Sequence, residues 1–239
     1  MILVISDVHG QFHVINEQID FAESALKKPV TSVVVLGDLG LFEVNLRRFF
    51  IRGKNRFKRP LYFIEGNHED FGAFDGLVKK YGEYFTHFAR GTIQSVDGHS
   101  FLCLGGARYM DLVNTPMHSE IRDCDIDACL AHPTGAVKII FSHDCPSGIG
   151  VPNTPGLEFY GQPGITRSAE LLRHYDPALW VFGHHHKWFF ARTGNTSFHG
   201  LPESWKGFGI LDDTLELTIF DNPVETAREP FWKRWFRNF

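Results

Sequence analysis

The stretch ILVISDVHG, residues 2–10, joins a β-branched apolar run to a cluster of polar residues and a glycine. Short apolar runs bounded in this way are typical of strands that are buried on both faces. An apolar run followed by a polar cluster recurs in four other stretches: SVVVLGDLG (32–40), LYFIEGNHED (61–70), VKIIFSHD (137–144) and LWVFGHHH (179–186). The sequence therefore predicts at least five core strands, each followed by a polar loop.

Helical patterns separate the first three of these strands. Residues 13–27 carry apolar side chains at the spacing of one helix face, and residues 43–52 and 70–80 have a similar character. Strands that alternate with helices form parallel sheets through right-handed connections. The first third of the chain therefore predicts a parallel sheet with helices outside it.

The second half of the chain adds hairpin patterns. Residues 93–97 and 101–104 flank Asp97-Gly98, a pair typical of tight hairpin turns. Residues 207–220 form another such pattern, with a turn at Asp212-Asp213. Antiparallel strands combined with parallel ones predict an α/β fold in four layers, an α/β/β/α sandwich in which helices flank two mixed sheets.

The composition is that of an ordinary folded protein without a dominant charge. Hydrophobic residues make up 43% of the 239 residues and charged residues 22%, so the chain can bury a core. The net charge of −4 creates no field that would draw the whole protein to nucleic acid or to a membrane. The N-terminal apolar run is too short for a signal peptide, and no run approaches the roughly 20 residues of a membrane span.

Cysteine usage indicates a reducing compartment. The four cysteines, Cys103, Cys124, Cys129 and Cys145, contain no CxxC pair. We expect reduced thiols and a cytoplasmic location.

Polar side chains at the ends of the predicted strands form a candidate metal site. The carboxyl ends of parallel strands share one edge of a sheet, where functional groups gather. The side chains at these ends are Asp7, His9, Asp38, Asn67, His68, His143, His184 and His186. Carboxylate, amide and imidazole without thiolate suit hard or borderline divalent ions such as Mn²⁺, Fe²⁺ or Zn²⁺.

Alternation within two segments supports this interpretation. In extended backbone, residues two apart point to the same side. His184 and His186 would then face the site together while His185 faces away, and Asp7 and His9 would do the same around Val8. We expect His185, His199, Asp70 and Asp144 to be candidates for supporting the ligand imidazoles.

The motifs DVH, GD, GNHE, a single histidine after a strand, and GHHH occur here in that order between residues 5 and 186. In this combination the chain resembles the calcineurin-like metallophosphoesterases. The resemblance implies a metal-dependent hydrolase of phosphate esters with two divalent metal ions, for which we expect Mn²⁺, with Fe²⁺, Zn²⁺ or another ion as the alternatives. Asp7, His9 and His186 would bind the first ion, Asn67, His143 and His184 the second, and Asp38 would bridge both. His68 would lie beside the substrate phosphate as a catalytic acid or cation.

The chemistry implied by this resemblance is attack of a metal-activated hydroxide on phosphorus. The substrate would be a small phosphomonoester, a phosphodiester or a nucleotide. The chain departs from the Ser/Thr protein phosphatase branch at three positions: Leu41 and Phe42 replace its second aspartate and its arginine, and Glu65 replaces the arginine before GNHE. This argues against that branch.

Two alternative functions stay open. Residues 47–60 carry seven Lys or Arg residues and no acid, and the segment 142–150 partly resembles RNA lariat-debranching enzymes. These features keep a nuclease or RNA-processing phosphodiesterase, and thus contact with nucleic acid, among the hypotheses. A non-catalytic binding scaffold of the same fold is the other alternative, although the complete ligand set argues against it.

Further predictions concern substrate contacts and the C-terminus. Arg108, Tyr160 and Arg167 are candidate substrate-binding residues, and the Gly- and Pro-rich segment 147–164 could lie over the site. We expect residues 1–222 to form the metallophosphoesterase domain and residues 223–239 to form an aromatic and basic tail. That tail could pack on the domain or mediate self-association, and membrane contact is not expected.

Overall fold

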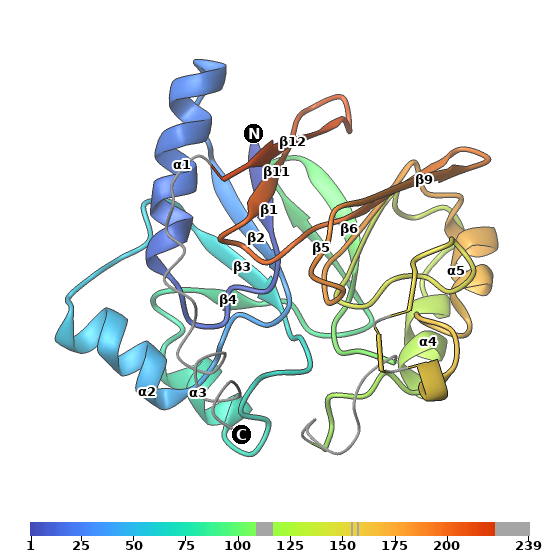
Figure 1. The fold of residues 1–239 in the computed structure, drawn as a ribbon, viewed down its shortest axis with the longest axis horizontal. Coiled ribbons are helices and arrows are strands. Elements are labelled where there is room, and N and C mark those ends of the chain that lie inside the picture. Colours follow the sequence, from blue (N-terminus) through green and yellow to red (C-terminus); the bar gives the residue numbers. More distant parts are fainter. Residues whose placement is uncertain (109–116, 154, 157, 223–239) are drawn as a thin grey trace.

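The computed structural model describes residues 1–108, 117–153, 155–156 and 158–222, and these form two sheets with helices on their outer faces (Figure 1). The first sheet has the spatial order β12 (Leu217–Asp221), β11 (Gly207–Leu211), β1 (Ile2–Ile5), β2 (Ser32–Leu36), β3 (Leu61–Ile64) and β4 (Thr86–His87). The second has the order β5 (Thr92–Val96), β6 (His99–Leu104), β7 (Ile139–Ser142), β8 (Leu179–Phe182), β10 (Thr196–Gly200) and β9 (Phe189–Thr193).

Both sheets are mixed. In the first, β1 to β4 are parallel and the β11–β12 hairpin adds an antiparallel edge. In the second, β6, β7, β8 and β10 are parallel, while β5 and β9 are antiparallel edges. The expected four-layer sandwich of two mixed sheets is therefore confirmed.

The core explains why the strand sequences are continuously apolar. Alternate residues of β1 enter different layers: Ile2 and Val4 lie between the sheets, whereas Leu3 and Ile5 face the helices. Both faces are buried, so an alternating polar pattern is absent. The helices and helical turns are α1 (His13–Leu26), α2 (Glu43–Leu46), the π-helix η1 (Arg47–Arg52), α3 (Phe74–Lys80), α4 (Asp123–Leu130), the 3₁₀ turn η2 (Glu158–Tyr160) and α5 (Ser168–Tyr175).

The helices divide between the two outer faces. Residues of α1, η1 and α3 pack on the first sheet. Ile126 of α4 and Leu171 of α5 pack on the second, around Trp180 of β8. Among the described helices, none is long and apolar enough to cross a membrane.

Two predicted helices differ from expectation in detail. The helix expected over residues 43–52 is a short α2 followed by the wider π-helix η1, which ends with Gly53 N–H donating to Arg48 O at 2.9 Å. The helix expected over 70–80 begins only at Phe74, because residues 70–73 form a turn in which Asp70 Oδ1 accepts the Ala73 N–H at 3.2 Å. Both predicted hairpins are present.

Several elements were not predicted. They are β4, β9, β10, α4, η2 and α5. The tail expected over residues 223–239 lies outside the described residues, so its packing and self-association stay predictions.

Candidate metal centre

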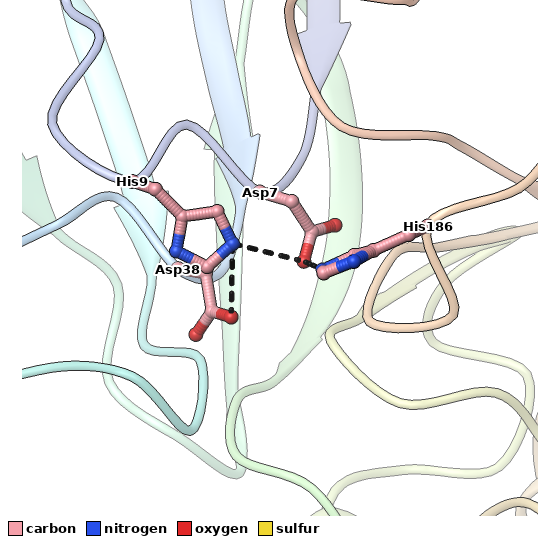
Figure 2. Close-up of side chains that lie close together, drawn as sticks. All are labelled: Asp7, His9, Asp38 and His186. Atoms are coloured by element: carbon pink, nitrogen blue, oxygen red, sulfur yellow. Dashed lines mark hydrogen bonds and ion pairs between the residues drawn. The ribbon is translucent and has the colours of Figure 1, made fainter. Parts of the chain in front are cut away.

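The carboxyl ends of β1, β2, β3, β7 and β8 meet at one edge of the sandwich and bring the predicted ligands together. The ligand atoms of Asp7, His9, Asp38 and His186 all lie within 4.8 Å of one another (Figure 2). Asp7 and Asp38 are fully buried, whereas His9 and His186 are half-buried. Residues 179 positions apart in the sequence thus form one cluster of nitrogen and oxygen donors.

The spacing within this cluster matches that of ligands around a cation. His186 Nε2 lies 3.0 Å from Asp7 Oδ1, and His9 Nε2 lies 3.7 Å from Asp38 Oδ2 and 4.0 Å from Asp7 Oδ1. Ligand atoms bound about 2.1 Å from one metal ion stand roughly 3–3.5 Å apart. The cluster therefore fits a divalent ion with little rearrangement.

His143 gives a second indication of a cation site. Its Nδ1 lies 2.7 Å from the Leu36 carbonyl oxygen, which can only accept, so Nδ1 carries the hydrogen. In the neutral ring, Nε2 then presents a lone pair to Asn67 Oδ1 at 2.9 Å and Asp38 Oδ1 at 3.5 Å. A cation bound at this point would therefore find three electron-rich atoms around it. The His184 ring, 5.0 Å from that of His143, completes this second group.

The backbone is unusual at five of these residues. Asp7, His9, Asp38, His184 and His186 all have positive φ, between 49° and 64°. Residues other than glycine adopt this left-handed conformation rarely, and such strain concentrates at functional sites. The extended backbone expected at His184 and His186 is absent, because both residues are left-handed, with φ of 64° and 55°.

Two motif glycines make room for the ligands. A Cβ at Gly66 would lie 2.0 Å from Asp38 Oδ1, and a Cβ at Gly37, where φ is +90°, would lie 2.2 Å from His143 Nδ1. Both contacts are too short for any other residue. The glycines of GD and GNHE are therefore needed for the close approach of the strand-end loops.

Burial and ion pairing oppose each other at the charged ligands. Burial disfavours the Asp7 carboxylate, but the neighbouring His186 outweighs it and holds the pKa of Asp7 below its usual range. Burial likewise opposes protonation of His186, yet Asp7 and Glu203 raise its pKa to about 8. Burial lowers the pKa of His9. The lowered pKa values of Asp7 and Asp38 favour the ionised carboxylates that metal binding requires.

His68 lies at the rim of the centre and not within it. Its side chain is exposed, and its ring centroid is 5.8 Å from that of His9. Its backbone N–H donates to Asp38 Oδ1 at 2.7 Å. Within the described residues no carboxylate contacts the His68 ring, since Glu43 binds Lys80 and Tyr81 and Asp70 caps the turn before α3.

Two buried glutamates support the centre and were not predicted to do so. Glu69 accepts the N–H groups of Leu39, Gly40 and Leu41 at 2.6 to 3.1 Å, and it thereby fixes the loop that carries Asp38. Glu203 Oε1 lies 3.8 Å from His186 Nδ1. Glu69 belongs to GNHE and could have been found there, whereas Glu203 follows β10 with no motif around it.

Glu65 has a structural role. It replaces the arginine of the protein phosphatase branch and lies buried, where it accepts bonds from His87 at 2.8 Å and Arg90 at 2.9 Å. Burial opposes its ionisation, but these two partners hold its pKa below the usual range.

The candidate substrate residues differ in availability. The Arg167 side chain binds Glu170 and Asp127 at 2.7 to 2.8 Å and so links α5 to α4. Arg108 pairs with Glu120 and lines a cavity of about 180 Å³. Tyr160 ends the 3₁₀ turn, and the position of its side chain lies outside the described structure.

The fold and the donor set together define a metal-dependent hydrolase of the α/β/β/α type. A sequence model of the calcineurin-like phosphoesterases matches residues 1–188, and the chain belongs to this family. It is accordingly a phosphoric ester hydrolase that uses divalent metal ions.

Solved structures agree with this fold. One superposes with a TM-score of 0.64 at 14% identity, over 92% of this chain and 98% of that chain. The phosphopantetheinyl hydrolase of Mycobacterium tuberculosis gives 0.54 at 15% identity, over 85% and 90% of the two chains. A Staphylococcus aureus protein assigned as a 5′-nucleotidase gives 0.54 at 14% identity, over 92% of this chain and 52% of that one.

Proposed function

We propose that the protein is a phosphodiesterase with a two-metal centre. Asp7, His9 and His186 would hold one ion, Asn67, His143 and His184 would hold the other, and Asp38 would contribute to both groups. Divalent ions bound there supply a water of lowered pKa and neutralise charge on the phosphate. The observation that carries this proposal is the cluster of four donor atoms within 4.8 Å, extended by the His143–Asn67 contact.

The donor set favours Mn²⁺, with Fe²⁺ or Zn²⁺ as the alternatives. Carboxylate and amide oxygens with imidazole nitrogens suit these ions, and none of the seven ligands is a cysteine. Metal analysis of the protein purified without chelator tests the assignment.

His68 acts as the acid that protonates the leaving oxygen. It is exposed beside His9, and the bond from its backbone to Asp38 fixes its position relative to the ligands. His68→Ala should lower turnover by about 10²- to 10⁴-fold, as expected for loss of general acid catalysis, without changing metal content. Loss of metal in that variant would instead make His68 a ligand.

The charges around the centre favour a diester over a monoester. A monoester carries about 1.5 to 2 negative charges at pH 7, so unpaired cationic side chains beside the metal ions would favour its binding. The positions that hold arginine in the protein phosphatase branch are Phe42 and Glu65. Arg90 and Arg108 are both bound to carboxylates. A diester, with about one charge, requires less compensation.

The test compares p-nitrophenyl phosphate with bis(p-nitrophenyl) phosphate in the presence of Mn²⁺. We expect faster turnover of the diester and its loss in Asp38→Asn. A higher kcat/KM for the monoester would contradict the diester preference. Absence of turnover of either ester with any divalent ion would favour the non-catalytic scaffold.

A nuclease is the second candidate, favoured by the segment 47–60. Four of its cations are exposed and form no ion pair with other described residues: Arg47, Arg48, Arg52 and Lys54. Arg48 also lines a groove of about 600 Å³ that begins at Gly10, next to His9.

The affinity for single-stranded oligonucleotides should therefore fall as the salt concentration rises. This salt dependence should be smaller in Arg48→Ala/Arg52→Ala than in the parent. Lys58→Ala is the matched control, because Lys58 pairs with Asp20. Equal salt slopes for all three proteins would remove this candidate.

We further propose a cytoplasmic location and a catalytic domain that ends near residue 222. The four free thiols support the first of these inferences.

A further inference from the structure

A buried carboxylate–imidazole pair lies beside the ligands from the second sheet. Asp144 follows His143, and His185 lies between His184 and His186. His185 Nε2 lies 2.9 Å from Asp144 Oδ1, and both side chains are almost completely inaccessible. The pair therefore joins the loop after β7 to the loop after β8, directly behind two of the candidate ligands.

Asp144 also reaches a third loop. Its Oδ2 accepts the N–H of Arg108 at 2.8 Å, and its Oδ1 accepts the N–H of Cys145 at 2.7 Å. Arg108 follows β6, so a single carboxylate connects the loops after three adjacent strands of the second sheet. These donors satisfy a charge that would otherwise be costly to bury.

Asp144, Cys145 and His185 could themselves be taken for a metal site, because their ligand atoms lie within 4.8 Å of one another. The contacts argue otherwise. Both Asp144 oxygens already accept backbone N–H groups, and an ion would have to displace His185 from the carboxylate. Cys145 is fully buried in the apolar cluster beneath the second sheet, where a thiolate is disfavoured.

The two groups of ligands are fastened differently. In the first group, Asp7 contacts His186 through Oδ1 and accepts the His184 N–H through Oδ2 at 3.0 Å. Asp7 follows β1, so the first sheet holds the loop after β8 in place. The position of His143 relative to that loop depends on the Asp144–His185 bond and on a backbone bond from Gly183 N–H to His143 O at 3.0 Å.

We propose that Asp144 and His185 are a positioning pair that sets the separation of His143 and His184 and thereby the affinity of the second metal position. The inference rests on the proposed two-metal centre. Residues that orient metal ligands typically change metal affinity by about 10- to 100-fold when they are removed. Loss of the pair should therefore weaken the second ion by that factor and leave the first nearly unchanged.

The experiment titrates the metal-free full-length protein with Mn²⁺ and follows ions bound per chain by calorimetry and by EPR, which separates isolated from coupled Mn²⁺. His185→Leu removes the bond to Asp144. His185→Gln restores a nitrogen at a similar reach and should recover the second site. His13→Leu, at an exposed histidine on α1, is the matched control. Circular dichroism confirms that each variant is folded.

We expect two ions in the parent, the control and His185→Gln, and one tight plus one weakened ion in His185→Leu. If His185→Leu does not fold, Asp144→Asn makes the same test from the other side of the bond. Parent-like binding of both ions in the variant that folds, or equal weakening of both, would overturn the proposal.

A third bound ion that is lost in Cys145→Ser would also overturn it, because the cluster would then be a metal site. If the parent binds no pair of ions, the proposed function fails instead, so the two failures are distinguishable.

Discussion

The two sheets contribute different chemistry to the candidate centre. The loops after β1, β2 and β3 of the first sheet supply both carboxylates, the amide and one imidazole, whereas the loops after β7 and β8 of the second supply imidazoles only. Contacts cross between them, from Asp7 to His186 and from Asp38 to His143. An anionic edge thus faces a neutral or cationic one. A cation bound between them should fasten one sheet to the other.

The largest expected effect comes from the carboxylate that both ligand groups share. Asp38→Ala should abolish binding of both ions and lower kcat/KM by about 10²-fold or more, the loss typical when one electrostatic contact to a transition state is removed. Asp75→Asn, at an exposed position on α3, serves as the control. Metal analysis after dialysis and steady-state kinetics measure the two effects. Retention of two ions in Asp38→Ala would show that Asp38 is not shared by the two ligand groups.

The candidate ligands could be found from sequence because each lies in the loop that follows a predicted strand. The five strand-and-loop stretches are local, and motif order made their convergence predictable. Their backbone was not predictable in the same way. The sequence predicted extended backbone at His184 and His186, but both residues are left-handed, with φ of 64° and 55°. Only the complete loop, closed against Asp7, holds them in that conformation.

Metal removal tests whether the ions join the sheets. A ligand that binds only the folded state at 100 times its dissociation constant adds about 2.7 kcal/mol to the free energy of unfolding. EDTA should therefore lower the melting temperature of the protein, and Mn²⁺ should restore it. Asp38→Asn should respond to neither treatment. Equal melting temperatures of the parent with and without Mn²⁺ would show that the two edges pack without help from a cation.

The residues that support the ligands were harder to predict than the candidate ligands themselves. The reason lies in the strands and helices from which they come. Glu203 follows β10, a strand whose register is set by pairing with β8 and β9, and neither β9 nor β10 has a distinct apolar run. The helices α4 and α5 have eight residues each, so their helical periodicity is too short to be recognised. Long-range packing, which no local pattern encodes, brings Glu203 to His186.

Glu203 allows a test with a smaller expected effect, which concerns only the support of His186 in the loop after β8. It is buried and lies against His186, and Lys206 pairs with it at 2.7 Å. Glu203→Gln keeps the shape but removes the charge, and it should weaken the first ion by about 10- to 100-fold. Glu216→Gln, at an exposed position before β12, should have no effect. Titration with Mn²⁺ compares the two variants. Weakening of the second ion alone would contradict the assignment of His186 to the first.

The smallest effect concerns the left-handed residues that lie away from both edges. Lys27 ends α1 with φ of 53° and is exposed, so its conformation only closes the helix. Glycine there removes roughly 1–2 kcal/mol of backbone strain but costs about 0.5–1 kcal/mol of entropy. Lys27→Gly should therefore raise the free energy of unfolding by about 0.5–1 kcal/mol, measured by urea denaturation, with unchanged metal binding. His184→Gly relieves the same strain at the metal centre, and there the loss of a ligand should lower metal affinity. If Lys27→Gly also lost metal, left-handed backbone far from the metal centre would affect metal binding as well. The distinction between Lys27 and the left-handed ligands would then be wrong.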